Sequence, residues 1–221
     1  METLEKVKQK FNVNINEKSP IFLKEQNRYE DLTVLFRELG FKVGAEIGVS
    51  KGRYSKFLLV KIPKLKLFCI DPYMAYNEYV EANREGGQET LNEHYEKAKG
   101  RLSKYDAIFV KKTSMEAVKD FEDESLDFVF IDGNHTFEYA VNDIAEWYKK
   151  VRKGGIVSGH DFWNSIEIED KRLWIENPTP EERIKLCQVK EAVIGWTKAN
   201  KIEPWFVLTG RRDKTWFWIK K

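Results

Sequence analysis

Two hydrophobic patterns alternate along the chain, one with the period of an α-helix and one made of short apolar runs. The apolar runs predict seven strands, at residues 43–49, 65–70, 107–110, 126–131, 156–159, 205–208 and 215–219. Between them, apolar positions three or four residues apart predict helices. Strands that alternate with helices pair in parallel and carry helices on both faces. This pattern predicts a doubly wound, Rossmann-like α/β sheet.

The last two predicted strands break the alternation. Only residues 209–214, with Gly-Arg-Arg-Asp at their centre, separate them, which is too short for a parallel crossover. The final strand must therefore run antiparallel to its neighbour. The predicted sheet has five parallel strands followed by an antiparallel hairpin, an unusual combination.

Composition limits the classes of protein that fit. The 221 residues suit one α/β domain, and a hydrophobic content of 42% supports a large core. With 38 basic and 36 acidic residues, the net charge of +2 gives no broad electrostatic footprint for nucleic acid. No apolar run approaches the ~20 residues that cross a bilayer. Residues 1–11 do not resemble a secretory signal, and two distant cysteines favour a reduced, cytoplasmic setting.

Three segments stand outside the regular pattern. Residues 1–40 are predicted to form an N-terminal helical cover or a dimer contact on a main domain at 41–221, so a homo-oligomer stays open. Segments 74–87 and 163–182 follow strands at the ligand edge, where either can form a lid. The second contains Trp163 and Trp174, which can stack on an acceptor molecule or simply pack a loop onto the core.

A candidate ligand site follows the first two strands. Ligands of open α/β sheets bind beyond the carboxyl ends of the strands. There, Gly48 permits a tight turn, and Gly52 opens a helix whose free N–H groups suit an anion. The second strand ends at Asp71, whose carboxylate can accept hydrogen bonds from both hydroxyls of a ribose. This combination predicts a cofactor that carries a nucleoside.

The glycine spacing narrows the cofactor. No segment matches a phosphate-binding loop, and Gly48-x-x-x-Gly52 does not match the dinucleotide fingerprint. Glu46, just before the turn, would repel a pyrophosphate but suits a cationic amino-acid group. These features favour S-adenosylmethionine (SAM) over NAD.

Four segments resemble class I SAM-dependent methyltransferases, and within them methyltransferase family 24, which includes macrocin-type and cephalosporin-biosynthesis-type O-methyltransferases. The segments are residues 45–55, 68–73, 125–135 and 151–161. The resemblance spans roughly residues 43–162 and implies a seven-stranded sheet of order 3-2-1-4-5-7-6. It implies SAM as cofactor and a cofactor-binding set of Glu46, Gly48, Ser50, Gly52, Asp71, Pro72, Ser114, Met115 and Asp132.

Within that set, the resemblance implies that Ser114 and Met115 flank the adenine, and that Asp132 and His135 lie near the sulfonium and the acceptor. Methyl transfer needs alignment of the nucleophile and removal of its proton. The candidate catalytic residues are His135, His160 and Asp132. The alternative for His135 is a structural hydrogen bond, and His94 is expected to be solvated on a surface helix.

A metal site is a second hypothesis for the same residues. Some relatives bind Mg²⁺ through acidic residues after strands four and five, and Asp132 and Asp161 would supply such oxygen ligands. His160 departs from the acidic or Asp-Asn pairs that are usual at this position. Imidazole is a poor Mg²⁺ ligand, so His160 does not favour a magnesium site. The alternative is that Asp161 caps the next loop, while His160 acts as a base or packs.

The resulting functional prediction is O-methylation of a small hydroxylated acceptor, such as a sugar or glycoside. Two alternatives keep the fold. One is an aminopropyl transferase that uses decarboxylated SAM, and the other is a non-catalytic SAM-binding or scaffold module. No membrane or nucleic-acid partner is expected.

Overall fold

The computed structural model confirms the predicted α/β architecture and describes residues 2–24, 30–76, 79, 86–163, 179, 186–209 and 214–221. Most of both predicted lids, including Trp174, lies outside the described residues. In chain order, the elements are α1 (Thr3–Phe11), β1 (Ile21–Lys24), α2 (Glu30–Glu38), β2 (Val43–Ile47), α3 (Arg53–Lys61), β3 (Lys66–Ile70), α5 (Gly87–Leu102), β4 (Ala107–Val110), α6 (Ser114–Ala117), η1 (Val118–Asp120), β5 (Leu126–Ile131), α7 (Phe137–Lys150), β6 (Val151–Gly159), α9 (Val189–Ala199), β7 (Trp205–Thr209) and β8 (Lys214–Ile219).

All seven predicted strands form one sheet, and an eighth joins them. The order is β1-β7-β8-β6-β5-β2-β3-β4. Numbered as predicted, β2 to β8 give the order 3-2-1-4-5-7-6, and β8 runs antiparallel to both β6 and β7. The additional strand is β1, which pairs in parallel with β7 at the edge of the sheet. The division at residue 40 stays a prediction, although β1 ties the N-terminal segment to the sheet.

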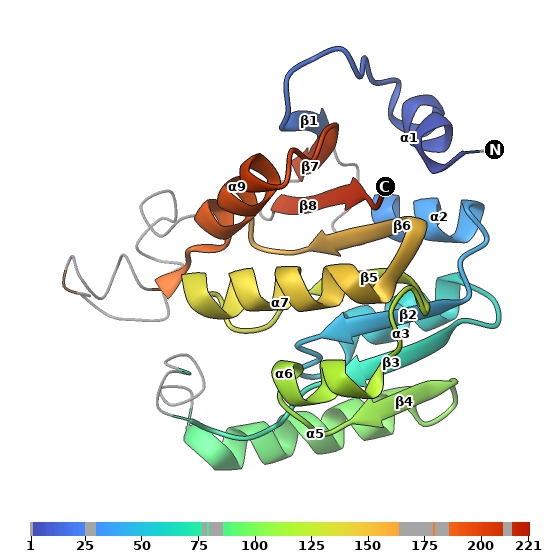
Figure 1. The fold of residues 1–221 in the computed structure, drawn as a ribbon. Helices are drawn as coiled ribbons and strands as arrows, with labels where there is room; N and C mark the ends of the chain where they lie inside the picture. The colour runs from blue at the N-terminus through green and yellow to red at the C-terminus, as the bar shows by residue number, and fades with distance from the viewer. Residues whose placement is uncertain are drawn as a thin grey trace.

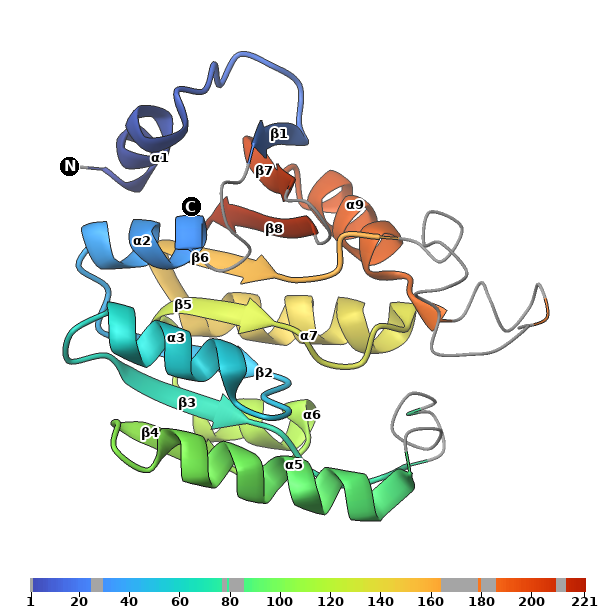
Figure 2. The same ribbon diagram turned by 180° about the vertical axis from the view of Figure 1, so that it is seen from behind.

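Helices cover both faces of the sheet, as Figures 1 and 2 show from opposite sides. Helices α6, α7 and α9 cover one face, and α2, α3 and α5 cover the other. Each layer has its own buried core. The core beneath α2, α3 and α5 includes Phe36, Leu58 and Phe128, and the core beneath α6, α7 and α9 includes Val129, Ile144 and Trp147. Because β5 contributes to both, its run Leu126–Ile131 is apolar almost throughout.

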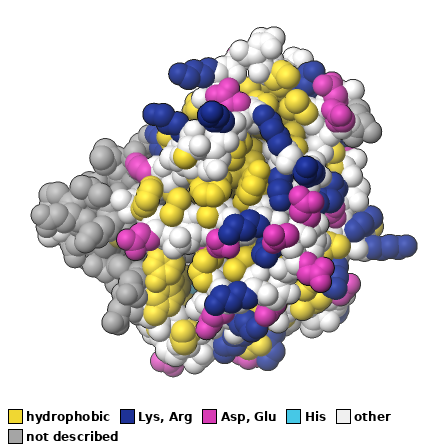
Figure 3. All heavy atoms as spheres, in the orientation of Figure 1, with side chains coloured by type: hydrophobic (Ala, Val, Ile, Leu, Met, Phe, Trp, Pro, Cys, Tyr) yellow, Lys and Arg dark blue, Asp and Glu magenta, His cyan; other side chains and the backbone are white. Residues whose placement is uncertain are grey.

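The surface carries mixed charges. On the face in Figure 3, basic and acidic side chains are interspersed over the described residues. Within the described part of the chain, no helix is long and apolar enough to cross a membrane.

The topology fixes where a ligand can bind. β2 pairs with β3 on one side and with β5 on the other, so the connections that leave β2 and β5 diverge at their carboxyl ends. Crevices at such switch points hold ligands in open α/β sheets. The segments 48–52, 71–76, 113–115, 132–136 and 160–163 all follow strands at this edge.

Candidate cofactor cavity and catalytic cluster

The turn after β2 lies directly against the end of β5. Gly48 has a φ of +85°, and a Cβ at this position would lie 1.9 Å from the Asp132 carbonyl oxygen. The Gly48 N–H donates to the Ile70 carbonyl at 2.9 Å. Only glycine therefore fits this turn, because any side chain would collide with the backbone of β5.

Asp71 holds the same turn in place. Its Oδ2 atom accepts hydrogen bonds from the backbone N–H groups of Val49 and Ser50, at 3.0 and 2.9 Å. Its Oδ1 atom accepts one from Tyr73 N–H at 2.8 Å. Burial raises the pKa of Asp71, although the three hydrogen bonds oppose that shift. The carboxylate that was predicted to bind a ribose therefore also shapes the glycine turn.

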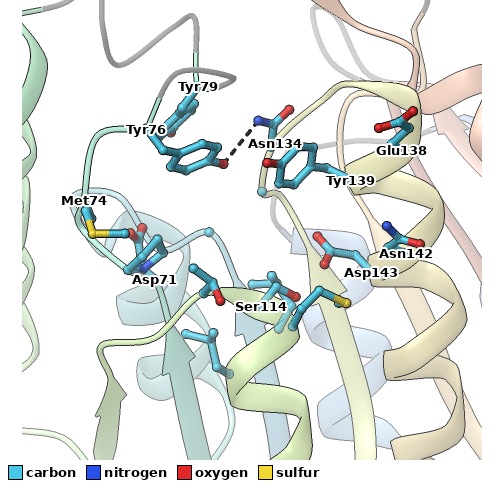
Figure 4. Close-up of a pocket in the computed structure, with 17 residues that line it drawn as sticks. Asp71, Met74, Tyr76, Tyr79, Ser114, Asn134, Glu138, Tyr139, Asn142 and Asp143 are labelled. Carbon is cyan, nitrogen blue, oxygen red and sulfur yellow. Dashed lines mark hydrogen bonds between the residues drawn. The ribbon is translucent and has the colours of Figure 1, made fainter.

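A cavity of about 530 Å³ opens beside this turn. Five predicted cofactor residues line it: Gly48, Asp71, Pro72, Ser114 and Met115. Ser114 and Met115 are the first residues of α6, whose start is fixed by reciprocal hydrogen bonds between Thr113 and Glu116. In Figure 4, Asp71 and Asp143 lie on opposite sides of the cavity, with Ser114 between them.

Other predicted cofactor residues lie outside the described lining. Glu46 is buried in the sheet, where the Ser55 hydroxyl of α3 donates to its carboxylate. Burial raises the pKa of Glu46 well above its usual range. Gly52 faces α5, because an added Cβ would lie 3.3 Å from Ala98. Glu46 and Gly52 therefore help to hold the turn in place, and direct contact between either residue and the cofactor stays a prediction.

One end of the cavity is polar, and the sequence prediction missed it. Asp143 of α7 lines the cavity and is only 4% exposed. Burial raises the pKa of Asp143 to about 7, while a hydrogen bond with Ser114 opposes the shift. Trp147 Nε1 donates to Ser114 Oγ at 2.8 Å. The available signal was an acidic residue on the apolar stripe of α7, between Ala140 and Trp147.

Aromatic rings form the mouth of the cavity. Tyr76 stacks on Tyr79 and on Tyr139, with ring centroids 5.3 and 5.8 Å apart. Asn134 Nδ2 donates to the Tyr76 hydroxyl at 3.2 Å, which links the segment after β3 to the segment after β5 (Figure 4). Burial raises the pKa of Tyr76 to about 12, so its hydroxyl stays neutral. These rings leave a narrow, partly apolar entrance.

The predicted catalytic residues form one cluster at the border of the cavity. His135 Nε2 lies 3.6 Å from Asp132 Oδ1 and 3.2 Å from Asp161 Oδ2. His160 Nδ1 lies 3.7 Å from Asp132 Oδ1 and 3.1 Å from Asp161 Oδ2. Burial acts to raise the pKa of Asp161, but His160 and His135 together hold it well below its usual range. Gly133, next to Asp132, lines the cavity, so cluster and cavity share a wall.

The third histidine differs from its prediction. His94 was expected to be solvated, but it is only 8% exposed and its Nδ1 atom lies 3.3 Å from Ser50 Oγ. Burial lowers the pKa of His94, and the nearby lysines 51 and 97 act in the same direction. The expectation was wrong because the middle of α5 packs against the glycine turn. His94 lies outside the cluster.

The comparisons agree on the fold. Similar structures include a protein from Corynebacterium glutamicum (TM-score 0.61, 14% identity, covering 99% of this chain and 89% of that chain). Another is an O-methyltransferase from Bacillus cereus in complex with SAH (TM-score 0.59, 14% identity, covering 99% of this chain and 90% of that chain). A third is the O-methyltransferase TomG from Streptomyces achromogenes, involved in tomaymycin synthesis, in complex with SAM (TM-score 0.58, 14% identity, covering 100% of this chain and 91% of that chain). No curated protein matches the chain. A family model described as a methyltransferase domain matches residues 45–162. Because that match covers more than half of the sequence, the chain belongs to methyltransferase family 24.

Proposed function

We propose that the protein transfers a methyl group from SAM to a hydroxyl of a small acceptor. The observation that carries this proposal is the shared wall between the cavity and the Asp–His cluster. Gly133 and Asn134 line a nucleoside-sized cavity, and the residues on either side of them, Asp132 and His135, belong to a cluster of groups that can accept a proton. Family membership and solved O-methyltransferases with SAM or SAH on the same fold support this assignment.

The cavity offers each part of adenosine a matching group. Asp71 lines the cavity and would accept hydrogen bonds from the ribose hydroxyls, because a carboxylate oxygen can accept more than one hydrogen bond. The apolar side chains of Ile70 and Met115 suit the faces of the adenine ring. Asp143 is an acceptor for the exocyclic amine of adenine, and Ser114 and Trp147 hold its carboxyl group in position. The sulfonium would then lie toward Gly48 and Gly133, next to the cluster.

The chemistry is a direct displacement. As the acceptor oxygen bonds to the methyl carbon, the S–CH₃ bond breaks and leaves neutral S-adenosylhomocysteine, while the acceptor proton passes to a base. His135 and His160 are the candidate bases, with Asp132 as a third. Asp161 lies within 3.2 Å of both imidazoles and would stabilise the imidazolium that forms.

Ligand-induced thermal stabilisation tests the cofactor assignment. We expect SAM and S-adenosylhomocysteine to raise the melting temperature, because each binds only the folded state, and NAD⁺ to leave it unchanged. A larger shift with decarboxylated SAM would replace the proposal by aminopropyl transfer. The absence of a shift with either SAM or S-adenosylhomocysteine would refute the cofactor assignment.

A matched pair of variants locates the binding site. Asp71→Ala should abolish most of the SAM-induced shift. Asp127 is the control, because its Oδ2 accepts from the N–H groups of Lys42 and Val43 at 2.6 and 2.9 Å, at the opposite end of the sheet. Asp127→Ala should lower the melting temperature of the free protein but retain the SAM-induced shift. Equal retention in both variants would contradict the ribose assignment.

A further inference from the structure

The predicted catalytic cluster contains two imidazoles and two carboxylates in close contact. Among the described residues, the ligand atoms of Asp132, His135 and Asp161 all lie within 4.8 Å of one another. His160 Nδ1 lies beside this group, at 3.1 Å from Asp161 Oδ2 and 3.7 Å from Asp132 Oδ1. Four nitrogen–oxygen distances between 3.1 and 3.7 Å therefore connect two nitrogen and two oxygen atoms.

These distances match the edges of a coordination tetrahedron. Nitrogen and oxygen ligands bind zinc at roughly 2.0–2.2 Å, so the edge of a regular tetrahedron around the ion is about 3.4 Å. The measured 3.1, 3.2, 3.6 and 3.7 Å lie on both sides of that value. These are four of the six edges of a tetrahedron, and Asp132, His135 and Asp161 already lie within reach of one ion, so binding by all four side chains would require His160 to adjust toward it.

The donor set does not fit the magnesium that the family resemblance implies. Mg²⁺ takes oxygen ligands in octahedral geometry and keeps several waters. Here two of the four donors are imidazole nitrogens, which suit zinc and other first-row transition metals. His160 stands where an acidic or amide side chain would complete an oxygen set. We propose that Asp132, His135, His160 and Asp161 bind one divalent transition-metal ion of the zinc class in place of Mg²⁺.

The surrounding backbone holds these donors rigidly. His160 is 4% exposed, and its N–H donates to the Ile131 carbonyl at 2.9 Å. Trp216 Nε1 donates to the His160 carbonyl at 3.1 Å. Asp161 has a φ of +51°, which turns the chain sharply between the two donors. A site with its ligands already in place binds an ion without a large ordering cost.

Metal binding changes which group takes the proton. An imidazole nitrogen that binds an ion cannot also act as a base, whereas each carboxylate donates one oxygen and keeps another. A bound zinc-class ion supplies a Lewis acid that lowers the pKa of a hydroxyl coordinated to it. In the loaded protein, the second oxygen of Asp132 or Asp161 is then the proton acceptor. Without metal, the cluster is a hydrogen-bonded acid–base group in which both histidines contact Asp161.

Direct binding measurements test this proposal without an activity assay. The protein is stripped with a chelator, titrated separately with Zn²⁺, Co²⁺ and Mg²⁺, and analysed for bound metal after gel filtration. We expect one equivalent of Zn²⁺, a visible Co²⁺ spectrum of four-coordinate type and a melting temperature raised by Zn²⁺ but not by equal Mg²⁺. Stoichiometric binding of Mg²⁺ with no preference for Zn²⁺ would overturn the proposal.

Variants identify the ligands. His135→Gln and Asp132→Asn should each lower Zn²⁺ affinity by about 100-fold or more, because changes outside the ligand shell alone cost ~10–100-fold. His160→Glu should weaken Zn²⁺ and strengthen Mg²⁺ binding. His94→Gln removes a histidine outside the cluster and should change neither. Unaltered Zn²⁺ binding in both His135→Gln and Asp132→Asn would refute the site.

The inference and the proposed function can fail separately. The SAM-induced thermal shift is measured on the same metal-free and Zn²⁺-loaded samples. Loss of the SAM shift with intact Zn²⁺ binding would remove the methyltransferase proposal and leave the metal site standing. A retained SAM shift without specific Zn²⁺ binding would remove the metal site and leave the methyltransferase proposal standing.

Discussion

Asp143 shows how one buried residue can affect both binding and stability. Its carboxyl group is 4% exposed at the polar end of the cavity, and its described partner there is the Ser114 hydroxyl. Because burial penalises the charged form, the pKa of Asp143 rises to about 7. A protein keeps such a group at a cost to its own stability, which fits a residue retained to contact a ligand.

The loss of stability that the buried Asp143 carboxyl group causes depends on pH. In the unfolded chain, Asp143 ionises near pH ~4, whereas in the folded protein it holds its proton up to about pH 7. The folded state therefore loses stability relative to the unfolded state as the pH rises from about 4 to about 7. Over ~3 pH units this amounts to about 4 kcal/mol. Urea unfolding at a series of pH values should show this decline in the wild type but not in Asp143→Asn. Parallel pH profiles for the two proteins would contradict it.

Single residues were predictable where chemistry follows a strand end directly. Asp71 and Asp132 come immediately after an apolar run, and Asp161 is the second residue after one, so their position at the ligand edge follows from the topology. Asp143 and Tyr139 lie inside a helix, and only the packing of α7 on the sheet turns them toward the cavity. The prediction for His94 was wrong for a similar reason, since its burial depends on how α5 packs against the turn that contains Ser50.

The turn between β2 and α3 is the most constrained connection at the site. Gly48, Ser50 and Gly52 all have positive φ angles, between 47° and 85°. Gly48 lies against the backbone of Asp132, and Asp71 holds the N–H groups that follow. The position of this part of the cavity wall therefore depends on the position of β5.

Two glycine substitutions compare this turn with an ordinary helix position. Gly48→Ala should destabilise the protein by more than about 2 kcal/mol, because it combines an unfavourable φ with a backbone clash. Gly100 lies inside α5 with nothing within 4 Å of an added Cβ. Gly100→Ala should stabilise by about 0.5–1 kcal/mol. Chemical denaturation measures both, and a tolerated Gly48→Ala would disprove the constraint.

Helices and strands were easier to predict when they are long and have a regular hydrophobic pattern. The buried strands β2, β3 and β5 are mostly apolar runs, so each was predicted with nearly correct bounds. β1 has only four residues that alternate between buried and exposed. Such a short segment resembles a loop in sequence, and its strand conformation depends on pairing with β7.

The whole molecule is closed at one edge by its N-terminal segment. β1 pairs with β7, Leu23 belongs to the core beneath α2 and α3, and the Thr209 hydroxyl donates to the Leu23 carbonyl at 3.1 Å. Phe22, the next residue in the same strand, is 59% exposed. The edge strand therefore contributes alternate side chains to the core of the domain.

Neighbouring substitutions in β1 measure that contribution. Leu23→Ala should cost about 2–5 kcal/mol of unfolding free energy, because it leaves a cavity in a close-packed core. Phe22→Ala should change it by less than about 0.5 kcal/mol, as expected for a surface position. Denaturant titration of both variants gives the comparison. Equal, small effects would show that β1 adds nothing to the stability of the domain.

The same edge pairing has a consequence for the order in which the protein folds. The Leu23 carbonyl and the Thr209 hydroxyl that contact each other are 186 positions apart in the chain. A ribosome adds roughly 5–20 residues each second, so β1 leaves it about 10–40 s before its partner strand exists. Contacts between such distant residues also form slowly. The parallel centre of the sheet is synthesised after β1 but before β7, so it can fold before β1 pairs, and the pairing of β1 with β7 then completes this edge of the sheet.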